Sequence, residues 1–381
     1  MFVVRVSAAW VAALLVAPFA AAQEADAEPP PILHAIPADA VGGMTLDVER
    51  LRGDPLFERT VAPLLADGGP FAVALGELGL SFADVRAVAA FVPPAPPPDP
   101  EERYPSRDPV GEPLFLVRVA GPVVVPEKLA ERGVARALPD GRTLALAIGR
   151  RGGETLAALG EPQAPAAGSA AALAEELGTE SPAALLLFGD VTAIRSAMLR
   201  ELDFAARRED EWIPAFGFAR PAVTDADAYA LAADLSGGAL SARLVAAAPD
   251  PAAAERLRQT AGAAVVVARN VLNGLPAAML RREPEEAAVV ALVAAALRKI
   301  LATVEVTGET GDGMSVRVGV SATVDAETTA VGADLLVAAV RAEFGPRESD
   351  RRPPRVREFR NAPEALEEPD ALNEPDALEE R

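Results

Sequence analysis

The sequence predicts an α+β protein whose sheets are mainly antiparallel and built from hairpins, with helices packed on one face. Two patterns carry this prediction. Apolar strands follow each other across short glycine turns, as in 227–247 around Gly237-Gly238, which is typical of β-hairpins. Helices are predicted in succession between the hairpins rather than singly between strands, which favours antiparallel over parallel pairing.

The first half of the chain contains most of the predicted strands. These share an apolar, β-branched composition and cover 41–48, 85–92, 114–119, 143–148 and 184–188. The predicted helices have apolar residues at helical spacing; one begins at Asp54-Pro55, and the others cover 70–79, 126–137, 170–178 and 190–203. The proline-rich stretch 93–113 lies between two predicted strands, so we expect a surface loop inserted into one sheet.

The last third of the chain has the clearest pattern. Strands are predicted at 227–235, 239–247, 304–306 and 314–322, the last pair turning at Gly311-Asp312-Gly313. Helices are predicted at 250–272, 284–302 and 326–344. The second of these helices begins with Pro284-Glu285-Glu286, and acidic residues are favourable in a first helical turn.

Residues 1–22 have the pattern of a secretory signal peptide. Arg5 precedes the uncharged apolar run 6–22, which ends in three alanines before Gln23, and signal peptidase recognises this order of charge, apolar core and small residues. We therefore expect an exported protein, periplasmic or extracellular. The alternative is an uncleaved N-terminal anchor, because the apolar run is close to the minimum length of a membrane span.

Composition divides the remaining chain into four parts. We expect a disordered leader at 23–35, an N-terminal α+β domain at 36–210, a C-terminal α+β domain at 211–345 and a disordered tail at 346–381. The tail is first arginine-rich and then repeats an Ala-Leu-x-Glu-Pro-Asp hexad. It is either a solvated segment that aids solubility or a multivalent motif that docks on an envelope protein.

A weak internal repeat suggests two related units. In both copies a Pro-Ala pair precedes an apolar strand, which is followed by an Asp-Val pair and then by an apolar residue and arginine. The first copy has Pro37-Ala38, Asp47-Val48 and Leu51-Arg52. The second copy has Pro182-Ala183, Asp190-Val191 and Ile194-Arg195. Aspartate at the end of a strand can cap the following helix. Duplication and chance similarity in an alanine- and valine-rich chain both explain the pattern.

Composition excludes several classes of function. The formal net charge is −20, which repels nucleic acid and anionic membranes. We expect no nucleic acid partner, and a membrane only if the signal peptide stays uncleaved. The chain has no cysteine, so thiol catalysis and thiolate metal sites are ruled out.

No catalytic, cofactor-binding or metal-ligating residues are predicted. The single histidine, His34, falls in the leader, where we expect a solvent-exposed bystander, and there is no Gly-x-Ser-x-Gly motif. Calcium could use Asp225 and Asp227, or Glu309 and Asp312, but neither pair lies in a twelve-residue ligand loop. A carboxylate pair for glycoside hydrolysis stays open, because 56 acidic residues offer many pairs.

The segment 204–223 is the clearest candidate binding site. It gathers aromatic and arginine residues in a chain with only 4% aromatic residues. The candidate ligand-binding residues are Arg207, Arg208, Trp212, Phe216 and Phe218. Two interpretations are open: a loop that binds an apolar or planar ligand through aromatics and arginine, or a plug that seals the junction between two domains.

The opening of the expected globular part resembles a group of uncharacterised exported proteins of GC-rich, planctomycete-like bacteria. The resemblance rests on Ile36-Pro-Ala-Asp-Ala40, Thr45-Leu-Asp-Val48, Leu51 and Asp54-Pro-Leu-Phe57. It implies an exported α+β protein of unknown function and supplies no catalytic residues. The expected function is therefore a non-enzymatic binding or scaffold protein of the cell envelope. The alternatives are a carboxylate-based envelope hydrolase and a membrane-tethered periplasmic domain.

Overall fold

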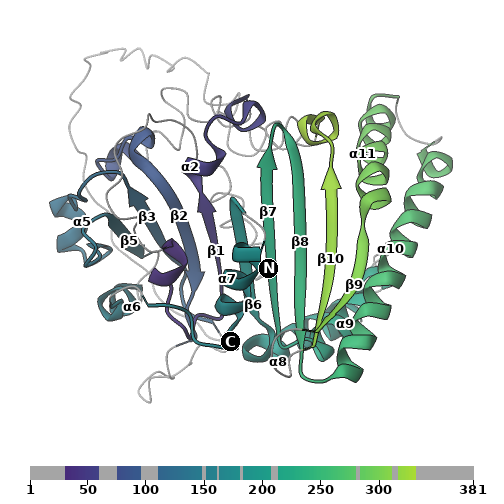
Figure 1. The fold of residues 1–381 in the computed structure, drawn as a ribbon, viewed down its shortest axis with the longest axis horizontal. Helices are drawn as coiled ribbons and strands as arrows, with labels where there is room; N and C mark the ends of the chain where they lie inside the picture. The colour runs from purple at the N-terminus through teal and green to yellow at the C-terminus, as the bar shows by residue number, and fades with distance from the viewer. Residues whose placement is uncertain are drawn as a thin grey trace, which may run out of the picture.

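The structure is a computed structural model that describes residues 31–59, 75–95, 110–147, 152–160, 163–180, 183–206, 213–279, 284–310 and 316–331. These residues form one 10-stranded sheet in the order β4-β5-β3-β2-β1-β6-β7-β8-β10-β9 (Figure 1). All neighbouring strands run antiparallel. The α+β class and the antiparallel pairing are thus confirmed.

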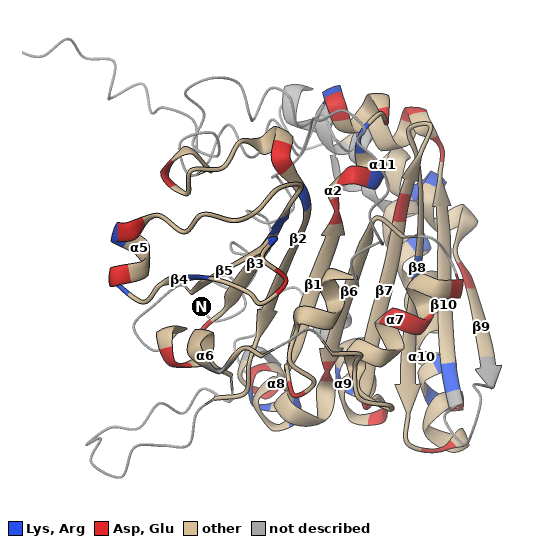
Figure 2. Ribbon diagram, turned by 60° about the vertical axis from the view of Figure 1, so that its left-hand side comes forward, with Lys and Arg blue, Asp and Glu red and all other residues tan. Residues whose placement is uncertain are grey.

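The strands match most of the expected ranges. They are β1 (Gly42–Asp47), β2 (Val85–Val92), β3 (Leu114–Val119), β4 (Ala135–Ala137), β5 (Thr143–Ala147), β6 (Leu185–Asp190), β7 (Ala228–Ser236), β8 (Ala239–Ala248), β9 (Glu305–Thr310) and β10 (Val316–Val324). Central strands carry almost no charged residues, which lie mainly on helices and near strand ends (Figure 2).

The helices and 3-10 turns connect these strands and cover them. They are η1 (Ile32–Ala35), α2 (Val48–Leu51), η2 (Phe82–Asp84), α5 (Glu127–Glu131), α6 (Gly152–Ala158), α7 (Ala170–Glu180), α8 (Val191–Ala206), α9 (Ile213–Asp225), α10 (Pro251–Met279) and α11 (Pro284–Thr303). Among the residues that the structure describes, no helix is both long and apolar enough to cross a membrane.

Helices cover the two faces of the sheet unequally. Val245 of β8 packs in a core cluster with η1, α6 and α7. Its neighbour Ala246 points to the other face and packs with α8, α9 and α10 because successive side chains of a strand alternate between faces. The long helices α8–α10 share one face, as expected, whereas α7, with η1 and α6, lies on the opposite face.

Two local expectations are corrected. The predicted helix 126–137 ends early as α5, and Ala135–Ala137 instead form strand β4, paired with β5 across the turn at Gly141. In the leader expected to be disordered at 23–35, η1 is ordered and Leu33 is only 2% exposed. In both places contact with the sheet overrides local composition.

The expected insertion at 93–113 joins adjacent antiparallel strands, β2 and β3. Pro94 and Val110 bridge its two ends, and 96–109 lie outside the described residues. The expected domain boundary at 210/211, the signal peptide, the turn at 311–313 and the tail also lie outside them.

The sheet consists of two topologically equivalent units that meet at its centre. We call β1–β5 unit 1 and β6–β10 unit 2, and we call the β1–β6 pair the seam. Counted outward from the seam, the strands run β1-β2-β3-β5-β4 on one side and β6-β7-β8-β10-β9 on the other. The units differ in two connections: α10 and α11 join β8 to β9, where only α5 joins β3 to β4. A tight turn at Gly237-Gly238 joins β7 to β8, where unit 1 has the proline-rich insertion.

Candidate functional site

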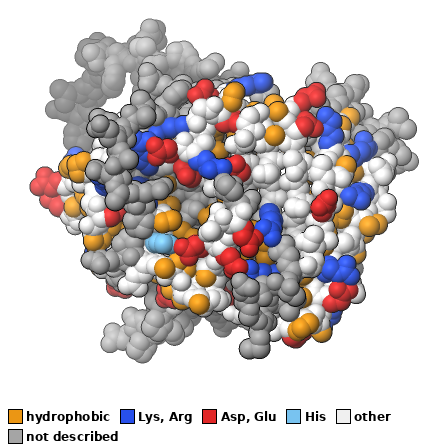
Figure 3. Space-filling view, in the orientation of Figure 1, with side chains coloured by type: hydrophobic (Ala, Val, Ile, Leu, Met, Phe, Trp, Pro, Cys, Tyr) orange, Lys and Arg blue, Asp and Glu red, His pale blue; other side chains and the backbone are white. Residues whose placement is uncertain are grey.

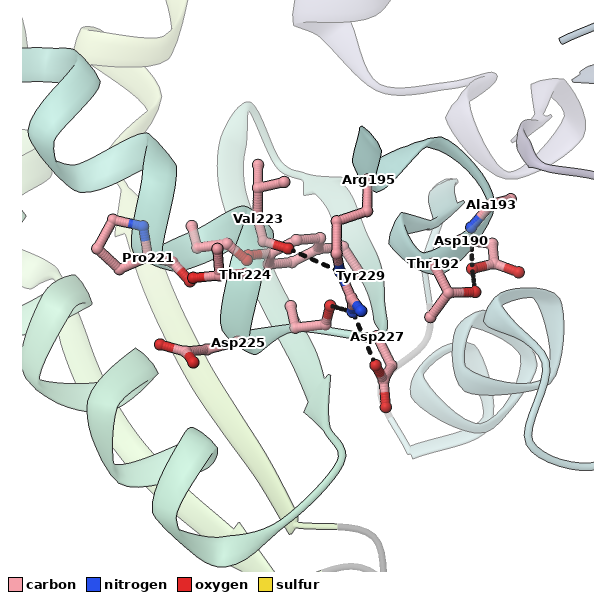
Figure 4. A network of polar contacts seen from close by, with 12 residues as sticks. Asp190, Thr192, Ala193, Arg195, Pro221, Val223, Thr224, Asp225, Asp227 and Tyr229 are labelled. Carbon is pink, nitrogen blue, oxygen red and sulfur yellow. Dashed lines mark hydrogen bonds and ion pairs between the residues drawn. The ribbon is translucent and has the colours of Figure 1, made fainter. Parts of the chain in front are cut away.

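A polar network joins β6, α8, α9 and β7 in unit 2 (Figure 4). Asp190 ends β6 and caps α8, because its Oδ1 accepts hydrogen bonds from the Ala193 amide at 3.2 Å and the Thr192 hydroxyl at 2.5 Å. The bond from Ala193 satisfies one of the amide groups that have no partner within the first helical turn.

Arg195 extends the network one turn along α8. Its Nη2 donates to the carbonyl oxygen of Ala226 at 2.7 Å and to Oδ1 of Asp227 at 2.9 Å, and its Nε donates to the carbonyl oxygen of Val223 at 3.2 Å (Figure 4). The guanidinium thus ties α8 to the segment that leads into β7. A planar group with five donors suits this task better than lysine would.

Tyr229 and Asp225 complete the network. The Tyr229 hydroxyl donates to the carbonyl oxygen of Ala222 at 2.7 Å. Burial, together with the negative charge of Asp225, raises the pKa of Tyr229 to about 12, so the phenol stays neutral and cannot serve as a base near neutral pH. Asp225 accepts two hydrogen bonds from Arg256 of α10, at 2.7 and 3.1 Å.

Unit 1 contains the same arrangement. Asp47 ends β1 and its Oδ1 accepts a hydrogen bond from the Arg50 amide at 2.9 Å. Arg52 donates to the carbonyl oxygens of Phe82 and Ala83 at 3.2 Å each, and also to that of Val85 at the start of β2. Burial lowers the pKa of Arg52.

Both networks stabilise the fold rather than perform chemistry. Nε and Nη2 of Arg195 and Nη2 of Arg52 donate to backbone carbonyls, and Asp227 is used by Arg195. Asp225 and Asp227, considered above for calcium, are therefore committed to separate arginines. Within the described part of the chain, no group of three or more His, Asp or Glu side chains could hold a metal ion.

His34 lies in a different environment from the one expected. Its Nε2 lies 2.5 Å from Oε1 of Glu175 on α7, and its side chain is 18% exposed, so it is not a free solvent-exposed residue. The carbonyl oxygen of His34 also accepts a hydrogen bond from the Gln163 amide at 2.7 Å. The chain's one histidine, pale blue in Figure 3, borders acidic side chains at the surface. These contacts hold η1 against α7.

The predicted ligand-binding residues span 207–218, from the end of α8 into α9. Arg207, Arg208 and Trp212 lie outside the described residues. Phe216 and Phe218 fall within α9, the helix that carries Ala222 and Val223 of the network. The expectation that these five residues bind a ligand stays a prediction.

Exposed apolar side chains form the strongest candidate for a binding surface. Of the large hydrophobic residues that are exposed in the described part of the chain, all but Val124 lie on α8, α10 or α11: Met198, Phe204, Val266, Val271 and Leu297. We call α8–α11 the helical layer. Val266 and Val271 are 54% and 57% exposed, and Leu297 is 41% exposed.

Two arginines join the helices of the α10–α11 hairpin. Arg269 of α10 donates to the carbonyl oxygen of Leu301 at 2.6 and 3.2 Å. Arg298 of α11 donates to the carbonyl oxygen of Leu272 at 2.5 Å. Between these positions the helices are uncharged, at 270–279 and 287–297. The two cross-links keep the helices together while apolar residues remain in contact with water.

The exposed face of the hairpin was not predicted from the sequence. The sequence predicts helices at 250–272 and 284–302 but not which of their faces stay exposed, because helices of globular proteins normally bury their apolar residues. The available signal was that 287–297 is uncharged on every side of the helix. Such a helix has more apolar surface than one contact with a sheet can cover.

Comparison with known proteins gives little further information. No family model matches the chain, and no curated protein matches it. Solved structures that match include crystal forms I, III and IV of TP0453. They share 10% to 11% identity with the chain, with TM-scores of 0.32, 0.36 and 0.34, respectively. These matches cover 78% to 81% of this chain and 94% to 100% of those chains.

Proposed function

We propose that the chain is an exported, non-enzymatic binding protein of the cell envelope, and that the helical layer α8–α11 carries its partner site. The observation that carries the proposal is the concentration of exposed large apolar side chains on this layer, five of the six in the described part of the chain. Exposed apolar side chains that gather on one surface mark sites of protein contact or ligand binding. The signal-peptide pattern predicted at residues 1–22 supports the envelope as the location.

The comparison of the two units supports the same conclusion. Unit 1 builds the strand order of unit 2 without any counterpart of the α10–α11 hairpin. The hairpin is therefore not needed to build a unit, and segments added to a scaffold often carry function. The partner that fits is a protein with an apolar patch, because the hairpin exposes Val266, Val271 and Leu297 and is uncharged at 270–279 and 287–297.

Site-specific photo-crosslinking in the full chain tests the proposal. A photoreactive residue replaces Val271, and in a matched variant it replaces Val124, which is 79% exposed in unit 1. After irradiation in envelope extract we expect one discrete adduct from the Val271 variant and none from the Val124 variant. Equal labelling at both positions, or no adduct at Val271, would contradict the proposal.

A truncated chain separates the layer from the tail. The Val271 variant is compared with the same variant ending at Gly345, which lacks the arginine-rich and hexad segments. An adduct that survives truncation assigns binding to the helical layer. An adduct lost on truncation assigns docking to the tail and overturns the layer as the partner site.

A further inference from the structure

The seam has the geometry of a two-fold interface between identical subunits. In its antiparallel register Met44 pairs with Leu187, and Leu46 pairs with Leu185. The Asp47 amide donates to the carbonyl oxygen of Ala184 at 2.7 Å, and the Asp190 amide donates to that of Val41 at 2.8 Å. In a two-fold, isologous interface each contact occurs twice. If residue i of one subunit contacts residue j of the other, residue j of the first subunit contacts residue i of the second.

The equivalence extends well beyond the seam. The spacing in sequence from Asp47 to Asp190 equals that from Arg52 to Arg195 and that from Val85 to Ala228. Each aspartate caps the helix that follows the seam strand. Each arginine binds carbonyl oxygens just before or at the start of the next strand. The capping aspartate, the arginine that binds carbonyl oxygens and the start of the next strand are therefore all related by the same shift along the sequence. Chance similarity of composition does not produce this agreement.

We propose that the chain is a fused dimer of one repeated unit, and that its seam is a self-complementary interface that fits a second copy of the chain. In the resulting assembly, β1 of one copy pairs with β6 of the other, and reciprocally. This inference is independent of the proposed binding function, because it concerns β1 and β6 and not the helical layer.

Reciprocal exchange is physically accessible to this chain. Each seam contact is the same whether the paired units belong to one chain or to two, so exchange loses no interaction at the seam. Helix α6 packs against β4 and β5 and stays with unit 1, so the connector that can extend is residues 159–169, which reach about 36 Å at about 3.3 Å per residue. What opposes exchange is the entropy of bringing two chains together, so the exchanged form is favoured by high protein concentration.

Cysteine pairing across the seam tests the proposal in the full chain. The chain contains no cysteine, so introduced thiols report without background. Thr45 and Leu186 are register partners in β1 and β6, at a separation that suits a disulfide. One chain carries Thr45→Cys and a second, separately purified chain carries Leu186→Cys. The two are mixed, unfolded in urea, refolded together and oxidised.

We expect a disulfide-linked heterodimer whose yield rises with protein concentration during refolding. The matched control replaces the second chain with Leu187→Cys, whose register partner is Met44 and whose side chain lies on the other face. We expect the control to give several-fold less heterodimer. A single chain with both Thr45→Cys and Leu186→Cys must form an internal disulfide, which validates the geometry.

The outcomes separate clearly. Concentration-dependent heterodimer from the in-register mixture alone supports the proposal. No heterodimer at any concentration, while the double variant closes its internal disulfide, overturns it. Equal heterodimer from both mixtures also overturns it, because cross-linking would then be non-specific.

Discussion

At the scale of single residues, the molecule depends on side chains that join segments distant in sequence. Arg195 and Arg52 each donate hydrogen bonds to backbone carbonyl oxygens. Without these bonds the oxygens would lose their hydrogen bonds to water on folding and gain none in return. Gly43 allows the ring of Phe188 to lie across the seam. The sequence indicated Asp47 and Asp190 as helix caps from local chemistry. It did not indicate what the arginines bind, because their partners lie on other elements.

Arg195→Met should lower the free energy of unfolding by about 2 kcal/mol, because carbonyl oxygens and Asp227 lose charge-assisted hydrogen bonds. Urea unfolding followed by circular dichroism measures the change. The control is Arg258→Met, since Arg258 pairs only with nearby Glu255 on the surface of α10 and should change stability by less than about 0.5 kcal/mol. Equal losses would show that the Arg195 clamp contributes nothing specific.

Gly43→Ala should destabilise the protein by about 1 to 3 kcal/mol. A Cβ at this position would lie 2.6 Å from Cζ of Phe188 and 3.1 Å from the carbonyl oxygen of Ala90. The matched control is Gly189→Ala in β6, where a Cβ would have no heavy atom within 4 Å. Thermal unfolding of both variants checks the difference, and a control as unstable as Gly43→Ala would refute the steric explanation.

At the scale of elements, side chains of α7 connect the N-terminal segment to strands of unit 2 that do not take part in the seam. Its residue Glu176 binds Arg317 of β10 through two hydrogen bonds of 2.7 Å. Glu180 binds Arg243 of β8 at 2.7 Å, and Glu175 binds His34 beside η1. Figure 2 shows this acidic helix lying over the strands. The helix therefore links the N-terminal segment to both β8 and β10.

Glu176→Gln should reduce stability at neutral pH and have less effect in acid. The hydrogen bond from Arg317 lowers the pKa of Glu176 below its ordinary 4.5. The contribution is thus present above the pKa of the unfolded chain and is lost as pH falls through the lower pKa of the folded state. The effect is modest because the Glu176 side chain is 43% exposed.

Melting temperatures of the wild type and Glu176→Gln, recorded from about pH 7 down to about pH 3, test this dependence. The two curves should converge as the pH falls. Glu131 is an exposed residue on α5. The melting temperature of Glu131→Gln should therefore change with pH in parallel with that of the wild type. A constant gap between the wild type and Glu176→Gln would contradict an ionic contribution.

The elements themselves differ in how far sequence predicted them. The strands at 85–92 and 114–119 have the predicted bounds, because apolar runs between proline or turn residues are a local signal. The short strand β4 was taken for helix, because its three residues have no strand pattern of their own and depend on pairing with β5. The apolar surface of α10 and α11 was missed because exposure depends on what packs against a helix.

At the scale of the whole molecule, one sheet runs through both units, with the seam at its centre and β4 and β9 at its edges. Strands near the seam are paired on both sides and buried, as Met44 and Phe91 show at 1% exposure. The edge strand β9 is paired on one side only and exposes Glu305, Thr307 and Gly308.

Hydrogen exchange of the native protein should therefore be slowest in β1, β2, β6 and β7 and fastest in β4 and β9. Opening a central strand disrupts pairing on two sides, whereas an edge strand can open locally. Mass spectrometry of peptides from each strand measures the order. Protection of β9 equal to that of β1 would contradict this account.

The sequence by itself determined the α+β class, the hairpins and most strand positions, because alternation, turn residues and caps act over a few neighbouring residues. Only the tertiary structure decided that both units share one sheet, that α7 lies on the face opposite α8–α10, and which apolar residues stay exposed. Glu175 and Glu176 each bind a partner 141 residues away. No local pattern encodes such contacts, because they form only when sheet pairing and burial have brought those segments together.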